Sequence, residues 1–198
     1  MTEAESSNPK HAIPSKALAL ALIGFGLLIL GGLALVLLIR SEAAIPEEAI
    51  DYPPAVPVPL DFRPSELRLA DIDGNPVSLA DYAGQVVLLN NWAFWCPPCR
   101  AELPELQEYY DAHRDQNFTI VGIEAGGELD DVLYHVKLYK LEYPIWLDPQ
   151  SKSLAAFKNG SLPNSYVIDE SGTVRLGWNG PINREMLEDY VTPLLEEQ

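Results

Sequence analysis

The sequence predicts an α/β fold in which helices flank a central mixed sheet. Three observations carry this prediction. Residues 86–92 (VVLLNNW) contain a continuous apolar run, as expected of a central strand that is covered on both faces. From there to residue 147, strand-like and helix-like segments alternate. Near the end of the chain, two short β-rich segments flank a turn, which indicates an antiparallel pair.

The first elements of this fold are predicted to form a hairpin. Polar and apolar residues alternate over 66–69, and Asp73-Gly74-Asn75 supplies residues suited to a tight turn. Val77 and Leu79 then resume the apolar pattern on the returning strand. We therefore expect two antiparallel strands ahead of the central strand.

The remaining elements follow from hydrophobic spacing and length. Apolar residues at helical spacing predict a helix over 97–115 and another over 128–141, and an amphipathic pattern predicts a last helix over 182–196. Short apolar runs predict strands. The expected strands are 118–123, 144–147, 165–168 and 174–178, with a short helix at 151–157.

Upstream of this domain the chain contains a long apolar run. Residues 17–39 are 23 residues without a charged side chain, which is long enough to cross a bilayer core as a helix. Lys10 and Lys16 precede the run, and acidic residues dominate after Arg40, so the positive-inside bias favours a cytoplasmic N-terminus. A cleaved signal peptide is the alternative, but the run is longer than a typical signal-peptide core.

These features divide the chain into four parts. We expect a cytoplasmic stub (1–16), a transmembrane signal anchor (17–39), a proline-rich acidic linker (40–64) and a folded domain (65–198) outside the cytoplasm. Because proline fixes φ and removes a backbone donor, the linker should be extended and semi-rigid.

Charge and cysteine content exclude several classes of function. The 198-residue chain carries 13 Lys and Arg against 29 Asp and Glu, a formal charge of −16, which disfavours nucleic acid as a partner. Its two cysteines cannot build a disulfide-dense scaffold or a four-cysteine zinc site. We expect no metal, no cofactor other than the cysteines themselves, and a monomer.

Both cysteines lie in Trp95-Cys96-Pro97-Pro98-Cys99, where the central strand ends and the next helix begins. Cysteines three residues apart at a helix N-terminus can close a small disulfide ring. The positive end of the helix dipole there favours the thiolate, the attacking species in thiol–disulfide exchange. The motif therefore points to a redox-active pair.

Three other interpretations of the pair compete with redox activity. A structural disulfide across so short a loop constrains the unfolded chain little. A zinc site needs two further ligands, and His113 and His135 lack zinc-finger spacing to the motif. A pair of inert buried thiols is more typical of a cytosolic core than of an exported domain.

The motif and its surroundings resemble membrane-anchored thioredoxin-like proteins of the TlpA/ResA type. Arg100-Ala101-Glu102-Leu103-Pro104 follows the cysteines as in that family, and Leu162-Pro163 resembles its cis-proline loop. The segment 128–147 resembles the helix–strand insertion of this branch, and the N-terminal hairpin and signal anchor match as well. The resemblance covers about residues 65–198 and implies a thioredoxin-like fold.

The resemblance also implies roles for individual residues. Cys96 would be the exposed nucleophile and Cys99 the buried resolving thiol, with a cis Pro163 presenting neighbouring backbone to a client. Glu102, three residues beyond Cys99 on one helix face, would accept the Cys99 proton; a solvated carboxylate is the alternative. The client would contact four residues, namely Trp95, Pro97, Pro98 and Leu162.

One position departs from thioredoxin itself. Thioredoxin has a buried aspartate six residues before its first cysteine, where this chain has Asn90, which cannot titrate. Proton transfer must then depend on Glu102, on Glu124 or on water. Glu124 is the weaker candidate, because carboxylates at strand ends are usually exposed.

The function implied is an extracytoplasmic thiol–disulfide oxidoreductase that reduces disulfides of exported proteins such as apocytochrome c. A membrane thiol donor would re-reduce it. A disulfide-forming oxidase could use the same residues in reverse. From another class, the domain could be a non-catalytic, membrane-tethered binding or chaperone module.

Overall fold

The computed structural model describes residues 24–33, 35 and 52–196. The chain divides into two compact units, Met1–Ile50 and Asp51–Gln198. In the first unit, residues 24–33 and 35 are helical, and the side chains of Phe25 and Leu28 are exposed. The rest of the predicted span 17–39 lies outside the described residues. Within the described ranges, no helix has both the length and the apolar character needed to cross a membrane.

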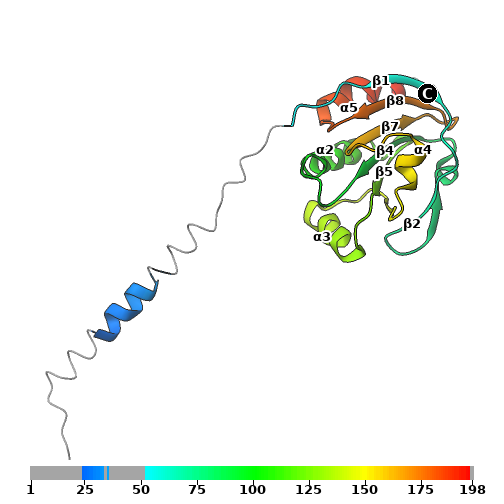
Figure 1. The fold of residues 1–198 in the computed structure, drawn as a ribbon. Coiled ribbons are helices and arrows are strands. Elements are labelled where there is room, and N and C mark those ends of the chain that lie inside the picture. Colours follow the sequence, from blue (N-terminus) through cyan, green and yellow to red (C-terminus); the bar gives the residue numbers. More distant parts are fainter. Residues whose placement is uncertain (1–23, 34, 36–51, 197–198) are drawn as a thin grey trace, which may run out of the picture. The chain divides into compact units, whose positions relative to one another are not determined.

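The second unit is built on one eight-stranded sheet with the strand order β1-β8-β7-β4-β5-β6-β2-β3 (Figure 1). Strands β4, β5 and β6 run parallel, and every other neighbouring pair is antiparallel. The sheet is therefore mixed, as predicted. The strands are β1 Val58–Phe62, β2 Arg68–Asp71, β3 Pro76–Ser78, β4 Val86–Trp92, β5 Phe118–Glu124, β6 Ile145–Leu147, β7 Asn164–Ile168 and β8 Val174–Asn179.

Helices connect and cover these strands. They are α2 Pro97–His113, α3 Leu129–Tyr139, α4 Lys152–Ala156, α5 Arg184–Tyr190 and α6 Thr192–Glu196, with a 3₁₀ helix η1 at Leu79–Tyr82. The predicted hairpins and the predicted alternation of strands and helices are confirmed.

Two hydrophobic clusters fill the two faces of the sheet, because successive side chains of a strand point to opposite faces. On β4, Val86, Leu88 and Trp92 pack with residues of α2, α3 and α5. Val87 and Leu89 pack on the other face, where Phe157 and Tyr82 lie. Figure 1 shows α2 and α4 on opposite sides of β4. All seven residues of β4 are buried, which explains the absence of polar–apolar alternation in its sequence.

Two predictions about the elements are wrong. The segment 40–64 was expected to be a linker throughout, but Val58–Phe62 forms edge strand β1 against β8. Leu60 and Phe62 pack against the second cluster, and an edge strand tolerates Pro59. The last helix is not continuous over 182–196: it divides into α5 and α6, because Pro193 lacks the N–H that would bond to the preceding turn.

The topology brings three segments to one edge of the sheet. Parallel strands β4 and β5 both end there, and antiparallel β7 begins there, with Asn91 of β4 paired to Asn164 of β7. The cysteine motif follows β4, and Leu162-Pro163 precedes β7. The two segments that the sequence singled out therefore lie at the same edge.

Candidate redox site

The cysteine motif caps the N-terminus of α2. Cys96 is the N-cap residue, Pro97 and Pro98 occupy the first two helical positions, and the Cys99 N–H donates to Cys96 Sγ at 3.4 Å. Proline fits these positions because first-turn N–H groups have no partner within the helix. Cys96 and Cys99 form a disulfide, with their Cα atoms 5.3 Å apart. The Cys96 sulfur thus lies where a backbone donor and the helix dipole stabilise negative charge.

The prediction that Cys96 is exposed is wrong for the oxidised protein. Cys96 is 5% exposed and Cys99 is 0% exposed. The cause is packing, since both belong to the cluster that contains Trp92, with Leu162 at its margin. The order of accessibility nevertheless agrees with the predicted roles: of the two cysteines, Cys96 keeps accessible surface.

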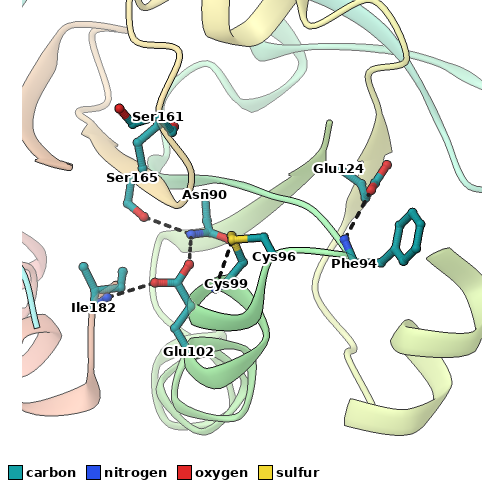
Figure 2. Close-up of a disulfide and its surroundings, with 10 residues drawn as sticks. Asn90, Phe94, Cys96, Cys99, Glu102, Glu124, Ser161, Ser165 and Ile182 are labelled. Atoms are coloured by element: carbon teal, nitrogen blue, oxygen red, sulfur yellow. Dashed lines mark hydrogen bonds between the residues drawn. A yellow bond between two sulfur atoms is a disulfide. The ribbon is translucent and has the colours of Figure 1, made fainter. Parts of the chain in front are cut away.

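Glu102 is buried beneath the cysteine pair (Figure 2) and is 2% exposed, which excludes a solvated carboxylate. Its Oε1 accepts a hydrogen bond from Asn90 Nδ2 at 2.7 Å, and its Oε2 accepts one from the Ile182 N–H at 2.9 Å. Asn90 Nδ2 also lies 3.0 Å from Ser165 Oγ. The carboxylate on α2 is therefore held by β4 and by the loop at Ile182, and β7 contacts it only through Asn90.

Burial controls the protonation of Glu102. Desolvation raises the pKa of Glu102 from 4.5 to about 8, and the hydrogen bonds from Ile182 and Asn90 offset only part of that rise. The carboxyl group can therefore gain or lose a proton near neutral pH. A group of this kind on the same helix face as Cys99 is suited to general acid–base chemistry.

Glu124 was expected to be exposed, and this is wrong: it is 1% exposed at the end of β5. Its Oε2 accepts from the Gly127 N–H at 2.7 Å and its Oε1 from the Phe94 N–H at 3.4 Å. Desolvation raises the pKa of Glu124, against these two bonds. Figure 2 shows Glu124 directed at Phe94, on the far side of the disulfide from Glu102. Its contacts tie together two loops of the site.

Three of the predicted client-contacting residues flank Cys96 in the sequence, and Leu162 packs against the cluster that contains Cys96. Trp95 is 58% exposed, Pro97 is exposed, and Pro98 and Leu162 are half-buried. The Leu162–Pro163 peptide bond is cis, the isomer that the resemblance implies. The Pro163 carbonyl accepts from the Gly180 N–H at 2.9 Å, which joins this loop to the end of β8.

The buried polar groups on the other face of β4 were not predicted from the sequence. Asn91 bonds to Asn164 and to Ser153, and all three are 0% exposed. A signal was present: two consecutive asparagines interrupt an apolar strand, and neighbouring residues of a strand point to opposite faces. Each buried amide therefore required its own set of partners.

Comparison with known proteins agrees with this architecture. Residues 62–176 match the profile of the AhpC/TSA family. The chain is 32% identical over 123 residues to the thiol-disulfide oxidoreductase ResA of Bacillus cereus, covering 62% of this chain and 71% of that protein. It is 32% identical over 123 residues to ResA of Geobacillus kaustophilus, with the same coverage.

Solved structures show the same fold. StoA from Bacillus subtilis is 29% identical, with a TM-score of 0.55 over 68% of this chain and 98% of that one. A DsbF homologue from Corynebacterium diphtheriae is 27% identical, with a TM-score of 0.64 over 70% of this chain and 92% of that one. With its Cys96–Cys99 disulfide, the chain therefore belongs to the thioredoxin-like AhpC/TSA family and is a thiol–disulfide oxidoreductase of the ResA type.

Proposed function

We propose that this oxidoreductase works outside the cytoplasm as a reductase of disulfides in exported proteins, with apocytochrome c as the expected client. The observation that carries the proposal is the cysteine pair at the N-terminus of α2, in which Cys96 keeps accessible surface and Cys99 lies above a buried titratable carboxyl group. The redox chemistry resides in the two sulfurs and needs no cofactor.

The reaction begins with the reduced pair. The Cys96 thiolate attacks one sulfur of the client disulfide, the client S–S bond breaks, and the released client thiolate takes up a proton. The product is a mixed disulfide between Cys96 and the client. The helix dipole and the Cys99 N–H stabilise the charge on Cys96 before attack.

The second step releases the client. Cys99 gives its proton to Glu102 and attacks the Cys96 sulfur, which closes the Cys96–Cys99 disulfide. The second client thiolate leaves and is protonated. Two electrons have then passed from the cysteine pair to the client. A membrane dithiol donor returns the pair to the reduced state by the same exchange in reverse.

The proposed location depends on the sequence. The 23-residue apolar run, with Lys10 and Lys16 ahead of it, supports a single-pass anchor with a cytoplasmic N-terminus and an exported catalytic domain. A disulfide-exchange domain is also suited to a compartment where client disulfides persist. Proteolysis of intact spheroplasts tests this location, since an exported domain is digested and a cytoplasmic one is protected.

The same residues could form disulfides instead, and the equilibrium with glutathione separates the two directions. A reductase pair has a reduction potential of about −270 mV, and an oxidase pair has one of about −120 mV. A non-catalytic binding or chaperone module would retain its function in a Cys96→Ser variant, whereas a reductase would lose it.

Trapping of the mixed disulfide with clients in cells tests the proposal. A Cys99→Ser variant cannot resolve the mixed disulfide, so we expect covalent complexes on non-reducing gels that disappear with dithiothreitol. Cys96→Ser is the matched control and should trap nothing. Mass spectrometry of the adducts should identify exported proteins with paired cysteines, and CxxCH proteins first. Equal trapping by both variants, or clients confined to the cytoplasm, would contradict the proposal.

A further inference from the structure

A series of buried polar side chains connects the N-terminus of α4 to the loop before β7. Ser153 Oγ donates to Asn91 Oδ1 at 2.6 Å, and Asn91 Nδ2 donates to Asn164 Oδ1 at 2.8 Å. Asn164 Nδ2 then donates to the Ser161 carbonyl at 2.6 Å. We call Ser153, Asn91 and Asn164 the amide chain.

Burying the amide chain costs free energy unless its polar groups are hydrogen-bonded. Its three members are 0% exposed, on the face of β4 that is otherwise packed with Leu89, Ile123 and other apolar residues. Burying polar groups is unfavourable unless they are hydrogen-bonded, and a partly satisfied network is worse than an apolar core. Each link here is bonded to the next, and the last bond goes to backbone rather than to a side chain.

Asp148 fixes the Ser153 end of the amide chain, which is the end away from the cis-proline loop. The Ser153 N–H donates to Asp148 Oδ2 at 2.7 Å, and the Lys152 N–H donates to Asp148 Oδ1 at 2.9 Å. Asp148 is 1% exposed, and its own N–H bonds to the Glu124 carbonyl at the end of β5. Asp148, which holds Ser153, is therefore itself bonded to the sheet.

The near end holds the cis-proline loop. The bond from Asn164 Nδ2 to the Ser161 carbonyl closes a ring around Leu162 and Pro163. Leu162 packs at the margin of the cluster that contains Cys96, and Figure 2 shows Ser161 among the residues around the disulfide. The position of this ring sets where backbone is offered to a client beside Cys96.

We propose that Asn91 and Asn164 are positioning residues for client binding. They hold the loop 161–163 where a client's backbone can pair with it beside Cys96. This inference rests on the proposed reductase function. The amide chain lies on the face of the sheet opposite to the one where Asn90 contacts Glu102. Its loss should therefore weaken client binding and leave the sulfur chemistry intact.

The test separates KM from kcat with two substrates of the reduced, purified full-length protein. One is a disulfide-bonded Cys-X-X-Cys-His peptide, which needs the loop, and the other is bis(2-hydroxyethyl) disulfide, which has no peptide backbone to pair with it. Asn164→Ala removes the bond to the Ser161 carbonyl and the bond from Asn91, and we expect the released loop to raise the peptide KM about tenfold, with kcat within about twofold. The rate with bis(2-hydroxyethyl) disulfide should also stay within about twofold.

Further variants keep the test decisive. Ser153→Ala removes the outer link of the amide chain and should raise the peptide KM in the same direction by a smaller factor, even if Asn164→Ala does not fold. Asn117→Ala is the matched control. Asn117 Nδ2 makes two bonds of 2.7 Å, to the Gly84 carbonyl and to Glu170, at the opposite edge of the sheet. It should leave the peptide KM unchanged.

Two results would overturn the inference. One is an unchanged peptide KM in folded Asn164→Ala and Ser153→Ala proteins. The other is an equal slowing with the peptide and with bis(2-hydroxyethyl) disulfide, which would assign the amide chain to general support of the disulfide. If the wild-type protein itself does not reduce the peptide, it is the proposed function that fails.

Discussion

Asn90 and Glu102 form a side-chain pair in which an amide on the central strand and a carboxyl group on the helix share one buried position, 2.7 Å apart. Asn90 stands where thioredoxin has an aspartate, so the titratable group has moved from the strand to the helix. Rotation of the Asn90 amide by 180° would present Oδ1 to Glu102 and to Ser165. The pair can therefore accommodate Glu102 both as carboxylate and as carboxylic acid.

The first prediction concerns the rate at which Cys99 resolves the mixed disulfide. Ionised Glu102 accepts the Cys99 proton, so this rate should rise as pH passes through about 8, the raised pKa of Glu102. In Glu102→Gln the rise should move to higher pH, and resolution at pH 8 should slow by about 10²-fold, as for loss of a general base. Rapid-quench kinetics with a disulfide peptide measure the step.

Gln is a suitable replacement, since a rotated Asn90 amide can accept from its Nε2 and from the Ser165 hydroxyl. Formation of the mixed disulfide by Cys96 is the internal control and should change little. An identical pH profile in both proteins would remove Glu102 from the proton path.

The second prediction concerns stability. The pKa of Glu102 is raised in the folded state to about 8, against 4.5 in the unfolded chain. Between these values the folded protein keeps a proton that the unfolded chain releases. Its contribution to the unfolding free energy is therefore full below pH 4.5 and falls by at most about 1.4 kcal/mol per unit as pH rises to 8.

Urea unfolding of the oxidised protein measures this, because subtracting the Glu102→Gln values removes the contribution of the other titrating groups. The difference, wild type minus variant, should decrease from pH 5 to pH 8. A difference that is constant or increases with pH would show that burial does not raise the pKa of Glu102.

The third prediction tests the contact between Gly127 and Glu124. A Cβ added at Gly127 would lie 2.6–2.8 Å from the Glu124 carboxylate, so Gly127→Ala must displace that group and should cost about 1–3 kcal/mol of unfolding free energy. In a Glu124→Ala background the same change should cost much less. Gly160→Ala is the matched control, since nothing lies within 4 Å of its added Cβ. Additive costs in the double variant would exclude the contact.

The fourth prediction concerns Trp95, whose side chain is 58% exposed next to Cys96. Trp95→Ala should raise the KM for a disulfide peptide by about tenfold through lost apolar contact, with the rate for bis(2-hydroxyethyl) disulfide unchanged. Because Trp95 is mostly exposed, the melting temperature should hardly change. Equal losses with both substrates would indicate a structural role instead.

Much of this protein could be predicted from local pattern. The apolar run of β4 predicts a buried strand, and the Asp-Gly-Asn turn predicts the hairpin of β2 and β3. Both signals come from residues adjacent in the sequence. The cysteine spacing specified the disulfide in the same way, since residues three apart at a helix start are always close. Strand β1 was missed because Pro59 and the prolines before it are typical of linkers, and only pairing with the distant β8 makes Val58–Phe62 an edge strand.

The burial of the site could not be read from the sequence. Glu124 ends a strand, where carboxylates are usually exposed, and its burial depends on loops contributed by Phe94 and Gly127. Likewise, the Ile182 N–H that binds Glu102 comes from 80 residues away. Contacts of this kind are set by tertiary packing and leave no periodic signal.

The most direct test of the account is a single-turnover assay. Reduced protein is mixed with a disulfide-bonded CxxCH peptide. The amount of peptide thiol and the amount of Cys96–Cys99 disulfide formed are then measured in the same sample. We predict that one peptide disulfide is reduced for each Cys96–Cys99 bond formed, and that Cys96→Ser reduces none. Peptide that stays oxidised with the wild-type protein, or that is reduced equally by Cys96→Ser, would contradict the assignment.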